Sequence, residues 1–112
     1  NIVINNMITI DDLQKVEIKV GRIVSVEEVE GSEKLYKLGV DFGEENLRQV
    51  LSGIRKFFEK DFLIGKQFSF ITNLEPRKMM GLESQAMILA TGDESLALLS
   101  PTIEVKNGSQ MR

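Results

Sequence analysis

The side chains of this chain that could do chemistry are carboxylates, lysines, hydroxyls and one tyrosine, because its 112 residues include no cysteine and no histidine. The missing cysteines exclude disulfides, thiolate nucleophiles and cysteine-based zinc or iron–sulfur sites. Histidine is the commonest metal ligand and the side chain best suited to proton transfer near neutral pH. Few routes to catalysis are left.

The densest group of carboxylates is Glu27, Glu28 and Glu30. Neighbouring residues of a strand point to opposite faces, and the turn after these residues is solvated, so a charged exposed surface explains the carboxylates better than an acid–base pair does. The same oxygens could bind a metal only weakly. Gly31 and Gly39 show neither the Walker spacing nor the dinucleotide fingerprint. We therefore expect no enzyme activity, no cofactor and no metal site.

A second group of functional side chains lies in a predicted hairpin, Gln67 to Ala90. Two apolar segments of strand length flank a loop in which Pro76 fixes one φ angle and Gly81 tolerates a positive φ. This pattern predicts a wide hairpin.

The tip of this hairpin carries Arg77, Lys78, Met79 and Met80. The methionines are long and polarizable, and we expect them to point outward because no core pattern continues beside them. A turn needs none of these four side chains. A surface that holds an irregular anionic partner could use all of them.

The net charge of −3 is unevenly distributed along the chain. Between Arg48 and Met80 there are seven basic and three acidic residues, a local charge of +4, so the rest of the chain carries −7. Screening limits the reach of exposed charges to about 8–10 Å, so the local balance decides what can bind. The alternative is that this unevenness arose by chance.

Helix and strand patterns indicate the elements that position these residues. Residues 1–7 show no clear pattern, and we interpret them as a linker or a cloning remnant, with a domain from 8 to 112. Thr9 and Asp12 form a capping box at the start of a short helix, Ile10 to about Lys15.

Alternating apolar residues then predict a series of strands. Val16, Ile18 and Val20 share one face of the first strand, and Gly21 marks a bend in it. Ile54, Phe57 and Phe58 recur at helical spacing, which predicts an amphipathic helix between the third and fourth strands. The five predicted strands are Val16–Val29, Lys34–Phe42, Arg48–Leu51, Gln67–Asn73 and Ser84–Ala90, followed by a C-terminal extension.

This order is that of an all-β, five-stranded oligonucleotide/oligosaccharide-binding (OB) barrel with a bent first strand. An SH3-like barrel has a similar number of strands but lacks the helix between strands three and four. The OB architecture brings the loop near residues 30–35 and the hairpin loop 74–81 to one rim, where OB folds bind ligands.

Basic residues on the strands and at this rim are available to phosphates: Lys19, Arg22, Lys34, Lys37 and Arg48, together with Arg77 and Lys78. For each residue of the first five alone, a solubility charge is an equally good explanation. Aromatic residues for stacking single strands are scarce, so a folded RNA contacted through its backbone fits better.

Five segments of the sequence together form a recognisable pattern: Val16–Ile23, Ser32–Tyr36, Val40–Gly43, Ser52–Gly53 and above all Asn73–Ala90. They resemble the tRNA-binding domain appended to the C-terminus of methionyl-tRNA synthetases. The resemblance extends to free-standing tRNA-binding proteins, export-related chaperone-like proteins and cytokine-like domains of synthetase-associated proteins. It covers roughly Ile8 to the C-terminus.

The resemblance implies a barrel that dimerises through extensions outside it and binds tRNA by structure rather than sequence. The polar positions of the family's hairpin correspond to Asn73, Lys78, Ser84 and Met87, and its loop lysine corresponds to Lys34. It also implies a module that captures tRNA for a synthetase catalytic domain. The alternative is a chaperone-like or protein-binding OB dimer in which Met79 and Met80 grip peptides.

No membrane segment is expected. The longest apolar run, Ala86–Ala90, is far shorter than the ~20 residues of a transmembrane helix. With the absence of cysteine, this predicts a cytoplasmic protein.

Overall fold

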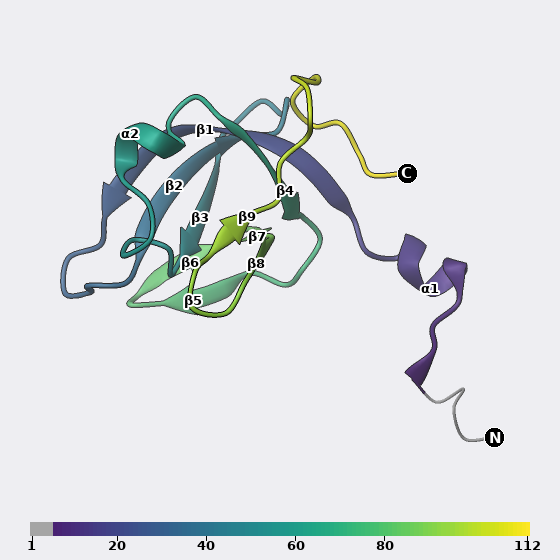
Figure 1. The fold of residues 1–112 in the computed structure, drawn as a ribbon, viewed down its shortest axis with the longest axis horizontal. Coiled ribbons are helices and arrows are strands. Elements are labelled where there is room, and N and C mark those ends of the chain that lie inside the picture. The colour runs from purple at the N-terminus through teal and green to yellow at the C-terminus, as the bar shows by residue number, and fades with distance from the viewer. Residues whose placement is uncertain (1–5) are drawn as a thin grey trace.

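A strongly curved antiparallel sheet organises the fold, as the computed structural model, which describes residues 6–112, shows in Figure 1. Its strand order is β3-β2-β1-β4-β7. The strands are β1 (Ile18–Glu28), β2 (Tyr36–Asp41), β3 (Arg48–Ser52), β4 (Gln67–Ile71) and β7 (Met87–Ile88).

The sheet closes into a barrel between β3 and the segment that joins β6 (Leu82–Ser84) to β7. The backbone N–H of Gln85 donates to the carbonyl of Gln49 at 2.8 Å, and the Gln49 N–H donates to the Gln85 side-chain oxygen at 2.8 Å. The Leu51 N–H donates to Ser84 Oγ at 2.9 Å. These bonds give a nearly closed five-stranded barrel and confirm the predicted OB-type all-β fold.

The alternation predicted for β2 and β4 is confirmed. Both strands direct every second side chain into the core, where Phe42 and Phe70 meet edge to face with ring centroids 5.1 Å apart. The fully buried side chains are Ile23, Leu38, Val40, Val50, Leu63 and Phe70.

The bend in β1 lies close to its predicted position. Gly21 is buried against Val40 and Phe42, and the pairing with β2 shifts register between Ile23 and Ser25, where Val24 is the extra residue. A bulge of this kind increases the local twist, which lets one strand pair with β2 at one end and β4 at the other.

The helix α2 (Lys60–Leu63) lies between β3 and β4 and ends before Gly65, but it begins at Lys60, later than the predicted start near Ile54. The backbone N–H groups of Phe57 and Phe58 both donate to the Ile54 carbonyl, which makes a single turn, and the backbone of Glu59 is extended. The hydroxyl of Tyr36 donates to the Phe58 carbonyl at 2.8 Å, which occupies an acceptor that a continuous helix would use. Burial also raises the pKa of Tyr36.

The predicted fifth strand is broken into pieces. β6 pairs with β5 (Arg77–Met79), β7 pairs with β4, and β8 (Ala90–Thr91) pairs with β9 (Ala97–Leu98). Between β6 and β7, Ser84 Oγ donates to the Ala86 carbonyl at 3.0 Å. A side-chain hydrogen bond is therefore made where the backbone hydrogen bonds between strands are interrupted.

The C-terminal extension returns to the start of β1. The Val20 N–H donates to Ser109, the Gly108 N–H donates to Val20, and the Met111 N–H donates to Ile18, at 2.7–2.9 Å. Ile18 and Val20 are half-buried and line a groove beside this extension, outside the barrel core.

Helix α1 (Ile10–Gln14) extends away from the barrel (Figure 1). Its predicted capping box is confirmed, with the Asp12 N–H donating to Thr9 Oγ1 at 3.1 Å and the Thr9 N–H to Asp12 Oδ2 at 3.2 Å. The predicted linker 1–7 lies outside the described residues except for Asn6 and Met7. Between residues 6 and 112, no helix has the length and apolar character needed to span a bilayer.

We predict that Gly21→Ala destabilises the protein, because a Cβ at this position would lie 2.5 Å from Val40 Cγ1 and 2.6 Å from Phe42 Cε1. Overpacking of this kind costs about 1–3 kcal/mol, measurable by urea unfolding. Gly53→Ala is the matched control, since a Cβ there meets nothing within 4 Å, and its stability should change by less than about 0.5 kcal/mol. Equal stabilities of the two variants would contradict this account of the bend.

Candidate nucleic-acid interface

The hairpin predicted to carry the site contains a smaller hairpin at its tip. β5 pairs with β6 in the register Arg77 with Ser84, Lys78 with Glu83 and Met79 with Leu82. The two turn residues, Met80 and Gly81, have φ angles of 52° and 79°. Two successive positive φ angles match the twist of a tight two-residue β-turn.

Successive side chains of β5 point to opposite faces of the hairpin, so the four tip residues predicted to act together do not share one face. The face of Arg77 and Met79 turns toward a pocket that Ser84 and Met87 also line, while Lys78 belongs to the opposite face with Glu83. Met79 is half-buried, so the expectation that both methionines point outward is wrong for Met79. Met80 is 56% exposed, as predicted.

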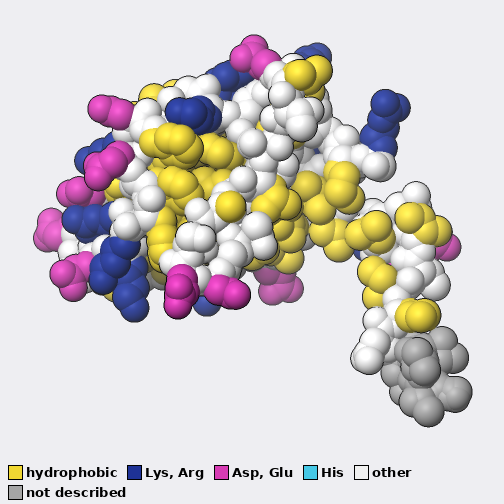
Figure 2. Space-filling model, in the orientation of Figure 1, with side chains coloured by type: hydrophobic (Ala, Val, Ile, Leu, Met, Phe, Trp, Pro, Cys, Tyr) yellow, Lys and Arg dark blue, Asp and Glu magenta, His cyan; other side chains and the backbone are white. Residues whose placement is uncertain are grey.

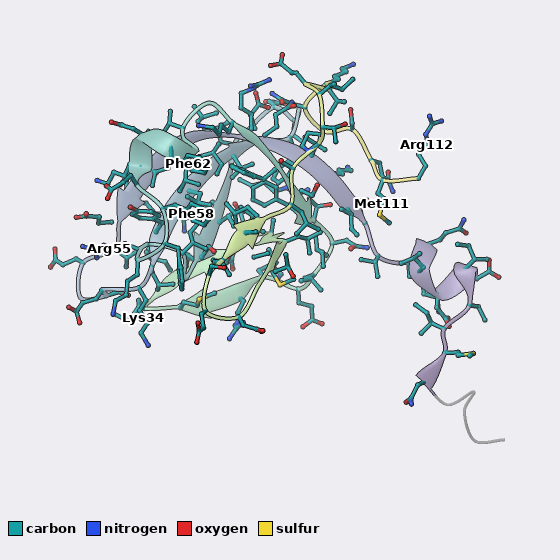
Figure 3. All side chains as sticks on the ribbon, viewed as in Figure 1. Lys34, Arg55, Phe58, Phe62, Met111 and Arg112 are labelled. Atoms are coloured by element: carbon teal, nitrogen blue, oxygen red, sulfur yellow. The ribbon has the colours of Figure 1, made fainter. Side chains whose placement is uncertain are left out.

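The loop between β1 and β2 lies beside this tip. A Cβ built on Gly31 would lie 3.3 Å from the terminal methyl of Met80, so the two loops are neighbours, as the OB architecture predicts. Ser32 Oγ accepts the N–H groups of Lys34 and Leu35 at 3.2 Å and shapes the loop. Lys34 lies at the same end of the molecule as the β5–β6 turn (Figures 1 and 3).

Three cations at this rim have no carboxylate within 4 Å among residues 6–112: Lys34, Arg77 and Lys78. All three are exposed. We call them the rim cations. Met87, 44% exposed, lies at the base of the same hairpin.

Other predicted cations are already engaged within the protein. Lys19 pairs with Glu17 at 3.5 Å. Arg22 pairs with Glu104 at 3.4 Å and donates to the carbonyl of Gly65 at 2.8 Å. These ion pairs reduce the positive charge that either residue offers to a phosphate, and neither lies at the rim.

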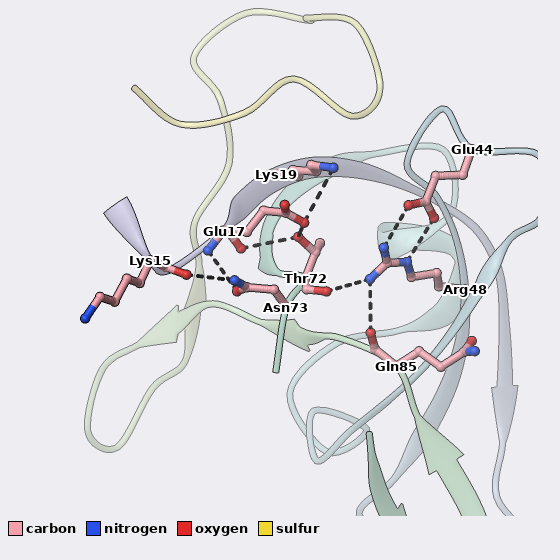
Figure 4. A network of polar contacts seen from close by, with 8 residues as sticks. All are labelled: Lys15, Glu17, Lys19, Glu44, Arg48, Thr72, Asn73 and Gln85. Carbon is pink, nitrogen blue, oxygen red and sulfur yellow. Dashed lines mark hydrogen bonds and ion pairs between the residues drawn. The ribbon is translucent and has the colours of Figure 1, made fainter. Parts of the chain in front are cut away.

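Arg48 is the most completely engaged of the predicted RNA-binding residues (Figure 4). Its Nε and Nη2 donate to the two carboxylate oxygens of Glu44 at 2.9 and 2.7 Å. Its Nη1 donates to the carbonyls of Thr72 at 2.7 Å and Gln85 at 3.3 Å, and its Cζ lies 5.4 Å from the Phe42 ring centroid. The paired hydrogen bonds lower the pKa of Glu44 and raise that of Arg48.

Asn73 and Ser84 also bond within the protein. The Asn73 side chain accepts from the Glu17 N–H at 2.8 Å and donates to the Lys15 carbonyl at 2.7 Å. Ser84 is 5% exposed and uses its hydroxyl to accept from Leu51 and donate to Ala86. The hydroxyl of neighbouring Thr72 donates to the Glu17 carboxylate at 2.6 Å, which lowers the pKa of Glu17.

A separate groove of about 630 Å³ was not predicted from the sequence. It lies between α2 and β9, where Figure 2 shows a patch of hydrophobic side chains. Phe58 and Phe62 stack there with centroids 5.4 Å apart, and Lys66 Nζ lies 4.3 Å from the Phe62 ring centroid. In the sequence, the one indication of an exposed aromatic residue at this position is that Phe62 follows two charged residues, Lys60 and Asp61.

No cluster of three or more acidic side chains between residues 6 and 112 could hold a metal ion. A nearly closed barrel with unpaired cations on two adjacent rim loops defines an OB-type nucleic-acid-binding module.

The comparison with known families agrees with this class. The family described as "Putative tRNA binding domain" matches residues 18–110. The chain therefore belongs to the tRNA-binding domain family, and the resemblance found in the sequence is confirmed.

Similar proteins include synthetases and free-standing proteins. The chain is 50% identical over 103 residues to the methionine–tRNA ligase of Methanococcus aeolicus, covering 92% of this chain and 15% of that protein. It is 49% identical over 105 residues to the methionine–tRNA ligase of Helicobacter pylori strain J99, covering 93% and 16%. The chain thus spans about one-sixth of the length of these curated relatives.

Two solved structures share the fold over nearly their whole length. A MetRS-related protein from Pyrococcus horikoshii superposes with a TM-score of 0.88 at 33% identity, covering 96% of this chain and 99% of that one. The chaperone CsaA from Bacillus anthracis superposes with a TM-score of 0.85 at 27% identity, covering 95% and 99%.

Proposed function

We propose that this chain is a non-catalytic module that binds tRNA through the loop between β1 and β2 and the β5–β6 hairpin. The observation that carries this proposal is that the rim cations lack carboxylate partners within 4 Å among residues 6–112, whereas the basic residues predicted on the barrel strands, such as Lys19, Arg22 and Arg48, are paired with the protein's own acids. An acidic protein can bind an anion when its unpaired positive charge is concentrated on one surface.

The chemistry of the rim favours recognition of shape over sequence. Neither residues 29–35 nor residues 74–84 include an aromatic side chain on which a base could stack. Lysine and arginine at such positions bind phosphates, which carry no sequence information. We therefore propose that the module contacts the backbone of a folded RNA.

We further propose that the module raises the local tRNA concentration for an aminoacyl-tRNA synthetase catalytic domain in the cytoplasm. Similarity to one-sixth of the length of methionine–tRNA ligases supports this role. Tethering a weak RNA-binding module to a catalytic domain makes the second contact intramolecular and increases overall affinity.

Lys78→Ala tests the site. We expect tRNA binding to weaken by about 1 kcal/mol, roughly fivefold, because one phosphate contact is lost. In titrations of labelled tRNA between ~50 and ~200 mM salt, the slope of log K against log salt should fall by about 0.7–0.9. Thermal stability should be unchanged, since the side chain is exposed.

Lys106→Ala is the matched control, because Lys106 is an exposed lysine of the C-terminal extension, away from the hairpin (Figure 1). Its tRNA affinity should equal that of the parent protein. Equal tRNA affinities of the two variants would contradict the proposed site. A tRNA affinity that does not change with salt concentration would also contradict it.

We also propose that the chain acts as a homodimer. The support is a continuous apolar region outside the barrel, visible on α1 in Figure 2. No residue of α1 is buried, and Ile10 is 65% exposed. Close to the start of β1, a groove of about 400 Å³ is lined by Ile18, Val20, Leu89, Leu99, Val105 and Met111.

Ile10→Asp should shift a dimer to monomer in sedimentation velocity measurements, because it introduces a charge into the apolar surface of α1. Leu47→Asp, at a leucine that is 51% exposed on the barrel, should not change the sedimentation coefficient. A wild-type protein that sediments as a monomer at all concentrations would contradict the dimer.

A second candidate function is protein binding, which the similarity to the chaperone CsaA favours. It ranks below RNA binding because Met79 is half-buried beneath the hairpin, which leaves Met80 as the one exposed methionine of the pair. A pull-down that recovers unfolded polypeptide but no tRNA would favour protein binding.

A further inference from the structure

The hairpin that carries Lys78 is attached to the barrel at its root. Between Asn73 and Gly81 every residue is exposed except the half-buried Met79. The Gln49 side chain donates to the Glu83 carbonyl at 2.9 Å, and Met80 lies beside Gly31. Besides these two contacts, the orientation of the tip depends on the bonds made where the hairpin leaves and rejoins the barrel.

Arg48 joins both limbs of the hairpin at this root. Its Nη1 donates to the carbonyl of Thr72, directly after β4, and to the carbonyl of Gln85, directly after β6 (Figure 4). A charged donor shared by two carbonyls fixes the separation of the two limbs. Bidentate bonding to Glu44 sets the rotation of the guanidinium group.

A second set of bonds fixes the first limb to the start of β1. The Thr72 N–H donates to the Glu17 carbonyl at 2.9 Å, and the Thr72 hydroxyl donates to the Glu17 carboxylate at 2.6 Å. Asn73 adds two bonds to the backbone of Lys15 and Glu17. We call Glu17, Arg48, Thr72 and Asn73 the polar clasp.

Most of the hydrogen-bonding capacity of Arg48 is used within the protein. All three nitrogens of the Arg48 guanidinium donate to protein oxygens, and both polar atoms of the Asn73 amide have protein partners. One N–H of Arg48 Nη2 has no acceptor among residues 6–112, so a phosphate could make a bidentate contact with Arg48 only by displacing a protein oxygen. Removal of a buried or half-buried partner also leaves unsatisfied carbonyls, which is costly.

We propose that the polar clasp is a positioning device: Arg48 and Asn73 contribute to tRNA affinity by fixing the hairpin that presents Lys78, and they do not contact RNA. This inference rests on the proposed function. It reassigns two residues that the sequence had grouped with the RNA-binding side chains.

A double-mutant cycle between Arg48→Gln and Lys78→Ala tests the inference. If Arg48 acts through the hairpin, each single variant binds tRNA about fivefold more weakly, and the double variant is little weaker than either. If Arg48 binds phosphate itself, the two effects multiply to about 25-fold, which would overturn the inference.

Arg48→Lys is a second variant that keeps the positive charge, in case Arg48→Gln does not fold. Lysine keeps the charge, but its ammonium has three donors at one point and cannot make the four bonds of Arg48, which include the bidentate pair with Glu44. The positioning role predicts a loss of affinity similar to that of Arg48→Gln, whereas retained affinity would indicate a simple charge contact and contradict the proposal. Arg22→Gln, at a paired arginine opposite Gln67 at the other end of β4, is the control and should bind normally.

Amide hydrogen exchange separates this inference from the proposed function. Arg48→Gln should speed exchange at residues 77–84 and leave the amides of Ile23 and Leu38 protected. If Lys78→Ala binds tRNA normally, the proposed site fails, but faster exchange at the hairpin still supports the clasp. Unchanged exchange at the hairpin would overturn the clasp whatever the binding result.

Discussion

Closure of the barrel between β3 and the returning limb of the hairpin is the constraint on which the rest of the structure depends. The returning limb carries no long strand there, so the closure uses a few bonds, among them those of Gln49 with Gln85 and of Leu51 with Ser84. The same segment therefore completes the hydrophobic core and projects the hairpin tip. Stability of the core and presentation of the rim cations are physically linked.

The distribution of ion pairs reconciles an acidic chain with an anionic ligand. Carboxylates neutralise the basic side chains that lie on the strands, such as Lys37 with Glu27 and Arg22 with Glu104. The rim keeps its cations free of such partners. The two rim loops also carry glutamates, namely Glu30, Glu33, Glu75 and Glu83. The rim therefore offers individual unpaired cations rather than a net positive surface. Acidic residues farther than about 10 Å from the rim are screened at physiological salt.

Much of the fold could be predicted from the sequence because its signals are local. The alternation from Tyr36 to Phe42 identifies the core face of β2, and the spacing of Thr9 and Asp12 identifies the start of α1. The start of α2 could not be predicted, since the Tyr36 hydroxyl, 22 residues away in sequence, occupies the Phe58 carbonyl.

The roles of the site residues depend on partners distant in sequence. Arg48 meets carbonyls 24 and 37 residues away, and Asn73 meets backbone 56 and 58 residues away. The sequence groups Arg48 with the phosphate-binding cations by its charge, and it groups Asn73 with Lys78 by the resemblance to the family's hairpin. The division of labour that we propose, between side chains that meet RNA and side chains that fix the hairpin, arises only from tertiary contacts.

The most direct test of the central claim is amide chemical-shift mapping of the ¹⁵N-labelled protein during titration with tRNA. The account predicts that the largest changes fall at residues 31–35 and 77–83, with little change at Phe62, Lys66 and Leu98 in the groove beside α2. Changes concentrated in that groove, with the hairpin unaffected, would contradict it.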